Sequence, residues 1–363
     1  MKISQNSSND SQRLTHPKYR ADIDGLRALA ILPVVWYHTS PKKVKGGFIG
    51  VDIFFVISGF LISSIIFSNL EHKKFSFIEF YSRRIKRIFP ALIIVLMAVY
   101  AFGWFTFSAE EFQQLGKHIA GGAGYISNFF LWKESGYFDN IAETKPLLHL
   151  WSLAIEEQFY IIWPLLLVFV WRKRWGFLAI TTTIAIASFA FNIFTIHKDP
   201  SAAFYSPFSR FWELMIGGAL AYISLHKSHW NSKYKEAQSI FGICLLSLGF
   251  ILVNKTCPYP GWYALLPTLG TFFIISSGPK AWFNKNILSN KILVWFGLIS
   301  YTLYLWHWPL LSCARIIEYQ APSKGIRYSF VAIAIVLAWL TYKFIEKPIR
   351  FGKHGKILTI ILF

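Results

Sequence analysis

The sequence predicts an all-α integral membrane protein, a bundle of about ten transmembrane helices with a cytoplasmic N-terminus. Residues of the set AVILMFWYC make up 54% of the 363-residue chain and charged residues only 15%, whereas soluble domains average about 25% charged residues. The mean hydropathy is +0.42. A chain with so few charged residues cannot cover its surface with polar groups, so part of that surface must face lipid.

The apolar residues are grouped into segments long enough to be membrane-spanning helices, each of which needs about 20 mainly apolar residues. The candidates lie at roughly 26–40, 48–69, 90–107, 147–170, 176–196, 211–225, 238–253, 264–277, 292–312 and 328–345. Several of these segments are short or contain polar residues, which predicts helices that are shielded inside the bundle.

The two ends of the chain differ from this central domain, which covers residues 20–352. Residues 1–19 are rich in Ser, Asn and Gln and have no apolar run, so we expect a disordered cytoplasmic tail and no cleavable signal peptide. The segment 353–363 contains the apolar run ILTIILF, which is seven residues long. It is too short to span a bilayer, and we expect it to be the start of a truncated eleventh helix.

Positive charge orients the predicted bundle. With a cytoplasmic N-terminus, the cytoplasmic segments hold 24 Lys and Arg residues and the external segments 12, as the positive-inside rule requires. The net charge of +19 is therefore largely a topology signal and an attraction to anionic membrane lipid, and a nucleic-acid partner is not needed to explain it. The three cysteines, at 244, 257 and 313, exclude a disulfide scaffold and a CxxC metal site.

Arg27 and His38 are polar residues inside the first apolar segment, where ionisable side chains are costly and are functional candidates. They are 11 residues apart, which places them on one helix face with roughly 16 Å of helix axis between them. One interpretation is that Arg27 reaches the headgroups and His38 caps the far end. The other is a polar stripe along a cavity, with Arg27 binding an anionic group and His38 transferring protons.

Asp52 lies near the start of the second segment, on the side of the membrane predicted for His38. It either orients that histidine, as an acid beside an imidazole does in catalytic triads, or is an ordinary carboxylate at a helix start. Both interpretations remain open from the sequence. Ser58 and Gly59, further along the segment, are small residues that permit close helix packing.

A dense basic cluster precedes the third segment, in a stretch expected to be a loop. Arg83, Arg84, Lys86 and Arg87 place four cations within five residues. Such a cluster anchors many membrane proteins on the cytoplasmic side. It would also suit a phosphorylated cytosolic donor, because arginine side chains match phosphate oxygens.

The fourth segment has one polar face in an otherwise apolar helix. The residues that recur at helical spacing are His149, Ser152, Glu156 and Tyr160, and Glu157 lies beside them. Two adjacent carboxylates in a membrane helix are expensive, so the pair is either functional or bound to a buried arginine.

Further polar residues lie closer to the C-terminus. Arg210 and Glu213 have the i, i+3 spacing of an internal ion pair. Ser300, Tyr304 and His307 line one helix face, a pattern that is also common at bilayer interfaces. Phosphate-binding loops, HExxH zinc motifs and GxSxG nucleophile elbows do not occur, so the sequence does not support hydrolysis by a metal or a serine triad.

The motifs resemble a known family in their order along the chain. The R-x10-H pair of Arg27 and His38 is followed by GFIGVDIFFVISGFLIS, RRIKRIFP, HLWSLAIEEQFYIIWP, RFWELMIGG, YPGWYALLPTLGT, GLISYTLYLWHWPL and FIEKPIR. Together they resemble the acyltransferase-3 family of membrane acyltransferases, specifically bacterial O-antigen and peptidoglycan O-acetyltransferases. The resemblance covers about residues 20–352.

This resemblance implies transfer of an acetyl or other short acyl group from cytosolic acyl-CoA to a hydroxyl of an envelope glycan, across the bacterial inner membrane. Acetyl-CoA would be the donor and no metal would be needed. Lipopolysaccharide O-antigen is the first acceptor to expect, with peptidoglycan or another exopolysaccharide as the alternative. Arg27 and His38 match the essential pair of the family. The basic cluster matches its CoA-binding motif, and the Glu156–Glu157 pair matches its acidic motif.

In the mechanism we expect, His38 is a general base on the acceptor hydroxyl or a transient acyl carrier. Asp52 or Glu156 would orient it, and Arg27 would hold the thioester end. Family members often continue into an SGNH hydrolase-like domain, which this chain lacks, so we expect a truncated form or a separate SGNH-type partner. Two alternatives remain open: a transporter or flippase whose polar faces line a permeation path, and an inactive homologue acting as a scaffold.

Overall fold

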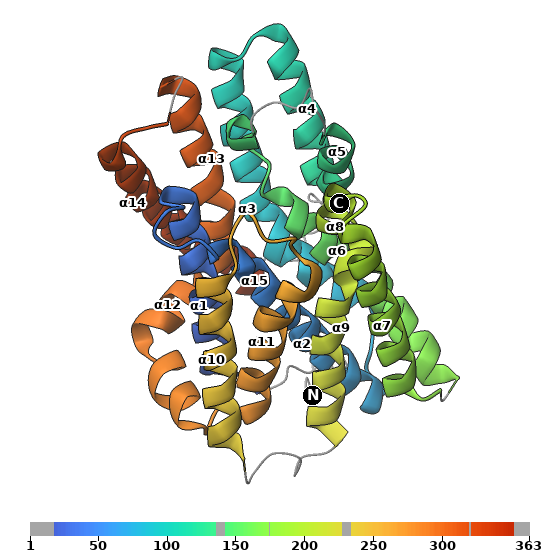
Figure 1. Cartoon of the computed structure of the whole chain (residues 1–363). Coiled ribbons are helices and arrows are strands. Elements are labelled where there is room, and N and C mark those ends of the chain that lie inside the picture. Colours follow the sequence, from blue (N-terminus) through green and yellow to red (C-terminus); the bar gives the residue numbers. More distant parts are fainter. Residues whose placement is uncertain (1–17, 136–141, 174, 227–233, 319–320, 352–363) are drawn as a thin grey trace, which may run out of the picture.

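The computed structural model describes residues 18–135, 142–173, 175–226, 234–318 and 321–351, and within these ranges the chain is helical and has no strand (Figure 1). The predicted all-α class is confirmed. The expected tail at 1–19 and the expected eleventh helix at 353–363 lie outside the described residues, apart from Lys18 and Tyr19.

The helices follow one another in the order α1 (Ala21–Thr39), η1 (Gly47–Ile49), α2 (Gly50–Glu71), α3 (Phe77–Thr106), α4 (Ala109–Ala123), α5 (Ser127–Glu134), η2 (Ala142–Thr144), α6 (Leu150–Arg172), α7 (Phe177–Ile196), α8 (Pro200–Tyr205), α9 (Pro207–His226), α10 (Lys235–Leu252), η3 (Gly261–Ala264), α11 (Leu265–Ser277), η4 (Asn284–Leu288), α12 (Lys291–Leu298), α13 (Ser300–Glu318), α14 (Lys324–Thr341), η5 (Tyr342–Glu346) and α15 (Lys347–Phe351).

Six helical segments of the described chain are long and apolar enough to cross a membrane. They are Gly47–Glu71, Phe77–Thr106, Leu150–Arg172, Phe177–Ile196, Lys235–Leu252 and Lys324–Phe351. The other predicted segments also fall on helices, namely α1, α9, α11 and the pair α12 and α13. The total of about ten spans and the cytoplasmic N-terminus stay predictions.

Two details of the predicted elements are wrong. The segment 292–312 is two helices, α12 and α13, because the chain turns at Ile299 between them. The basic cluster is not in a loop, because α3 already begins at Phe77, where the Ser76 hydroxyl accepts a hydrogen bond from the Glu79 N–H at 3.4 Å. Its cations are therefore distributed around a helix.

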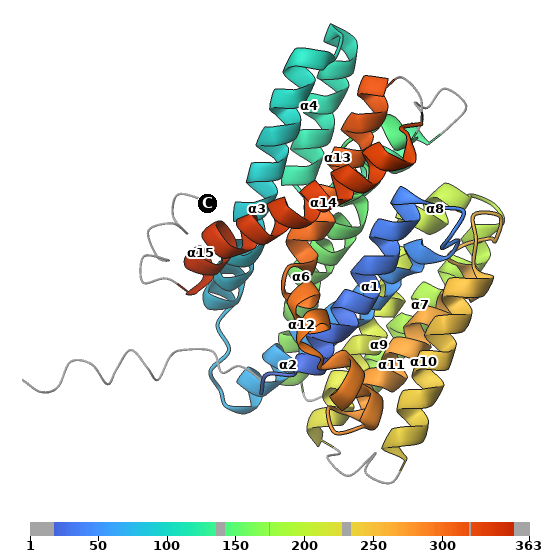
Figure 2. The same cartoon turned by 90° about the vertical axis from the view of Figure 1, so that its left-hand side faces the viewer.

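The stretch between the predicted segments 90–107 and 147–170 also forms helices. Ser108 and Glu111 form a reciprocal capping box at the start of α4, a sequence signal that could have predicted this helix. In both views α3 and α4 lie side by side and project together from one end of the molecule (Figures 1 and 2).

Helix α2 lies in the bundle interior and packs most extensively against α9. Their backbones touch at glycines: a Cβ atom on Gly59 would lie 1.8 Å from the Leu214 carbonyl oxygen, and one on Gly217 would lie 2.1 Å from the Val56 carbonyl oxygen. The prediction that Gly59 permits close helix packing is confirmed, because any side chain there would collide with backbone.

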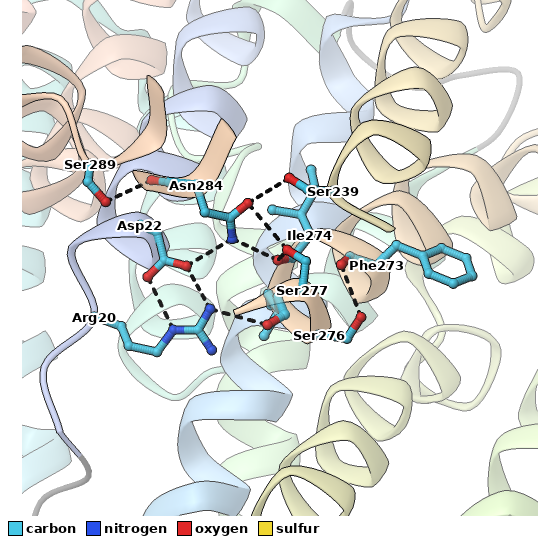
Figure 3. A network of polar contacts seen from close by, with 10 residues as sticks. Arg20, Asp22, Ser239, Phe273, Ile274, Ser276, Ser277, Asn284 and Ser289 are labelled. Atoms are coloured by element: carbon cyan, nitrogen blue, oxygen red, sulfur yellow. Dashed lines mark hydrogen bonds and ion pairs between the residues drawn. The ribbon is translucent and has the colours of Figure 1, made fainter. Parts of the chain in front are cut away.

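Helix α1 is held between α2, α12 and α13 (Figure 2). A buried polar network fixes its first turn (Figure 3). Asp22 accepts hydrogen bonds from the Arg20 guanidinium at 2.6 Å and from the Asn284 amide at 3.0 Å. Arg20 and Asn284 also donate to the carbonyls of Ile275 and Ile274. Because these are the last carbonyls of α11, the network ties the start of α1 to the end of α11.

Candidate functional site

Helix α1 lines two cavities, one towards each of its ends. The Arg27 cavity has a volume of about 80 Å³ and the His38 cavity about 880 Å³. Val51 and Tyr304 line both cavities, so these two side chains separate them. The predicted polar stripe of α1 therefore faces the interior of the bundle at both positions, as the cavity interpretation required.

The Arg27 cavity is lined by five of the ten charged residues that the sequence singled out. Its polar lining consists of Arg27, Ser58, Arg84, Arg87, Ser152, Glu156, Glu157, Tyr160, Ser300, Tyr301 and Tyr304. The Arg27 guanidinium lies 3.6 Å from the Asp24 carboxylate. The volume of the Arg27 cavity, about 80 Å³, is the space of a few water molecules. It suits the small acyl end of a donor and is too small for the phosphate-bearing part of CoA.

The two glutamates of α6 have different surroundings. Glu156 accepts hydrogen bonds from the hydroxyls of Ser58 and Tyr160. Glu157 is 7% exposed, and its Oε1 atom is buried without a hydrogen-bond partner among the described residues. Both therefore line the cavity, as the predicted polar face indicated, but only Glu156 is fixed by a hydrogen-bond network.

The helix divides the basic cluster into two pairs. Arg84 and Arg87, at i and i+3, line the Arg27 cavity. Arg83 instead forms an ion pair with Glu79 one turn earlier on α3, and Lys86 is not among the residues that line the cavity. Residues three or four apart share a helix face, so only half of the predicted CoA-binding cluster faces the candidate donor site.

His38 is held by another histidine. Its Nδ1 atom lies 3.0 Å from Nε2 of His307, and the two rings are stacked with centroids 5.2 Å apart. His307 is fully buried, and its Nδ1 atom lies 2.7 Å from the carbonyl oxygen of Tyr304. This carbonyl can only accept a hydrogen bond, so Nδ1 of His307 carries a proton and, in the neutral ring, Nε2 is an acceptor.

The tautomer of His38 follows from this chain of contacts. Because Nε2 of His307 accepts, Nδ1 of His38 donates to it, and the lone pair of His38 is then on Nε2. His38 lines the larger cavity. A neutral imidazole whose Nδ1–H is fixed by an acceptor and whose Nε2 is unprotonated has the arrangement of a general base.

Neither carboxylate that was expected to orient His38 contacts it. Asp52 accepts a hydrogen bond from the Arg210 guanidinium at 3.0 Å. Glu156 accepts hydrogen bonds from the hydroxyls of Ser58 and Tyr160. The expectation that Asp52 or Glu156 orients His38 is therefore not met by this structure. The reason is that α9 packs against α2. This packing places the buried Arg210 beside Asp52, so the Asp52 carboxylate is bound to Arg210 and not to His38.

Asp52 belongs instead to a buried charge cluster in the wall of the His38 cavity. Arg210 lies 3.2 Å from Glu213, so the predicted internal ion pair is present, and all three charged side chains are fully buried. Burial, together with the neighbouring Asp52 charge, raises the pKa of the Tyr259 phenol well above its usual value. The Tyr259 phenol therefore stays protonated at neutral pH.

Tyr304, which lines both cavities, and His149, which lines the larger one, were seen in the sequence but not assigned a site role. The Tyr304 hydroxyl lies 2.6 Å from the Ser152 hydroxyl and donates to the His149 carbonyl at 2.7 Å. The His149 ring lines the larger cavity, and neither of its nitrogens has a partner among the described residues. In the described chain, no group of three His, Cys, Asp or Glu side chains is placed to hold a metal ion.

Comparison with known protein families matches residues 20–343 to an acyltransferase domain, that of the acyltransferase-3 family. The chain belongs to this family. It is 34% identical over 356 residues to the peptidoglycan O-acetyltransferase OatA of Listeria monocytogenes, which covers 94% of this chain and 57% of that protein.

Further relatives of this acyltransferase-3 chain have similar identity. It is 34% identical to the YrhL protein of Bacillus subtilis, named as a candidate peptidoglycan O-acetyltransferase, over 92% of this chain and 55% of that protein. A Staphylococcus aureus protein named as a candidate O-acetyltransferase is also 34% identical, over 92% and 58%. The chain thus spans a little more than half the length of these relatives. No solved structure matches it.

Proposed function

We propose that this chain transfers an acetyl group from acyl-CoA, bound on the cytoplasmic side of the bacterial inner membrane, to a hydroxyl of peptidoglycan on the other side. The observation that carries the proposal is the pair of cavities along α1, with Arg27 in one and His38, oriented by His307, in the other. Membership of the acyltransferase-3 family and the polar lining of both cavities support it.

The donor would bind at the Arg27 cavity. Three arginines line it against two glutamates, so the site has an excess of positive charge. Guanidinium groups hold phosphate oxygens in paired hydrogen bonds, and Arg84 and Arg87, which line the cavity, would bind the phosphates of CoA at the cavity entrance. The acyl end would then extend past Arg27 towards Tyr304. This placement agrees with the cytoplasmic N-terminus that the distribution of positive charge predicts.

The acceptor would bind in the His38 cavity, whose volume of about 880 Å³ lies in the range of small-ligand sites. Nε2 of His38 removes the hydroxyl proton while the acceptor oxygen attacks the acyl carbon. The carbon–sulfur bond then breaks, and the CoA thiolate leaves and takes up a proton, which regenerates neutral His38. Acylation of His38 itself before transfer is the alternative order of steps.

Peptidoglycan is the acceptor we propose, ahead of lipopolysaccharide O-antigen, because two of the relatives are named for peptidoglycan O-acetylation. The proposal is tested in membranes that contain the protein, supplied with labelled acetyl-CoA and purified peptidoglycan. We expect labelled ester on the glycan, and none with His38→Ala at equal protein level. If the thioester is not consumed while a solute crosses the membrane intact, the protein is a transporter and the proposal is wrong.

A further inference from the structure

The charged residues that line the His38 cavity are unbalanced. Among the described residues they are Asp52, Glu143, Arg210, Lys255, Arg315 and Arg327, four cations against two carboxylates. The carboxylates are occupied, because Asp52 is hydrogen-bonded to Arg210 and Glu143 lies 3.8 Å from Arg315. Lys255 and Arg327 therefore have no carboxylate partner within the described chain.

These two cations flank His38. The Lys255 ammonium lies 5.8 Å from the centroid of the Tyr37 ring, the residue before His38. The Arg327 guanidinium donates through Nη1 to the carbonyl of Thr39, the residue after it, at 2.6 Å. The Nε atom of Arg327 is buried and has no partner among the described residues. One cation comes from the loop after α10 and the other from the first turn of α14, and both line the same cavity as His38.

The lining of the His38 cavity also includes several aromatic side chains. Tyr37, Phe48, Trp151, Tyr259 and Trp308 contribute rings to the cavity. Lys255 is exposed and Arg327 is half-buried, so the two cations lie where the cavity meets solvent, and cations of one sign beside apolar walls attract an anion into such a cleft. A neutral acceptor would leave both cations without an anionic partner, because Arg327 has only the Thr39 carbonyl as a hydrogen-bond acceptor among the described residues.

We propose that the His38 cavity binds a saccharide that carries an anionic group, a carboxylate or a phosphate, against Lys255 and Arg327. The hydroxyl to be acylated then lies at His38. The inference rests on the proposed function for the role of this saccharide as acceptor, but the charge preference of the cavity is a binding property that does not require transfer.

The test is titration calorimetry on the detergent-purified full chain with three probes. They are the methyl glycoside of N-acetylmuramic acid, which carries a carboxylate, N-acetylglucosamine 1-phosphate, which carries a phosphate, and the neutral methyl glycoside of N-acetylglucosamine. We expect at least one anionic probe to bind about tenfold more tightly than the neutral one. Lys255→Gln and Arg327→Gln should each raise the Kd of that anionic probe by about fivefold. This factor corresponds to the upper end of the energy of exposed ion pairs.

Controls separate charge from folding. Lys324→Gln removes a cation from the same turn of α14 that does not line the cavity, and it should bind all probes as the unaltered protein does. Arg327→Lys keeps the cation and should keep the preference for the anionic probe, whereas Lys255→Glu reverses the charge at the other position and should abolish binding of the anionic probe.

The outcomes are decisive in each direction. Preference for the carboxylate or for the phosphate supports the inference and identifies the source of the charge. Equal affinity for all three probes, binding of none of them, or the same loss in Lys324→Gln as in Lys255→Gln, overturns it. Acetyl transfer is measured separately, so a protein that prefers the anionic probe but transfers no acetyl group contradicts the proposed function and leaves the charge preference intact.

Discussion

Replacement of His307 by alanine is the sharpest test of how His38 is activated. The 3.0 Å contact from Nδ1 of His38 to Nε2 of His307 would be lost, although His307 does not itself line either cavity. When His38 takes up the hydroxyl proton it becomes positively charged, and its Nδ1–H···N hydrogen bond becomes a bond from a charged donor. Such bonds contribute about 1.5–3 kcal/mol.

That energy corresponds to a loss of roughly 10- to 150-fold in kcat, at about 1.36 kcal/mol per factor of ten. KM for the acceptor should change little, because the bond strengthens only as charge develops. His307→Gln retains an amide oxygen that can accept from His38, and should recover part of the rate. His38→Ala should lose more than either variant, because it removes the base itself.

The assay is acetyl transfer from labelled acetyl-CoA in proteoliposomes, with kcat and KM measured separately. Thr302→Val is the matched control, since Thr302 is a buried residue of α13 whose hydroxyl donates only to the Ile299 carbonyl. If folded His307→Ala has a kcat within about threefold of the unaltered protein, or if it changes only KM, the assignment of His307 as the residue that orients His38 is refuted.

Three further outcomes follow from the geometry. Arg84→Gln should lower kcat/KM for acetyl-CoA by about tenfold or more, since hydrogen bonds to charged groups contribute about 1.5–3 kcal/mol. Arg83→Gln is the control, and its kcat/KM should stay within about threefold of the unaltered protein. Equal losses of kcat/KM in steady-state assays would contradict the division of the basic cluster. Gly59→Ala should destabilise the detergent-solubilised protein by up to about 3 kcal/mol, as overpacking does. Gly116→Ala, inside α4 and with no atom near the added methyl, should not destabilise it and should stabilise it by up to about 1 kcal/mol. Thermal unfolding followed by circular dichroism measures both. Asp52→Ala removes one of the two carboxylates that pair with the buried Arg210, and it should lower the free energy of unfolding by about 3 kcal/mol in the same assay. A decrease below about 1 kcal/mol would show that Glu213 alone is enough to pair with Arg210.

The sequence by itself determined the helical membrane character and most of the residues of the candidate site. These features are local. Apolar content and segment length decide whether a stretch can be a buried helix, and the cost of charge in such a stretch marks Arg27, His38, Glu156 and Glu157 as candidates. Helical periodicity also placed Arg27 and His38 on one face, and in the structure both line cavities.

Only the tertiary structure decided which groups act on one another. His38 and His307 are 269 positions apart, and Asp52 and Arg210 are 158 apart, so no spacing rule links them. A buried carboxylate binds whichever cation the packing brings nearest, and the glycine contacts between α2 and α9 bring Arg210 to Asp52. The division of the basic cluster and the unpaired Lys255 and Arg327 have the same origin, because charge pairing depends on distances across helices that the sequence order does not contain.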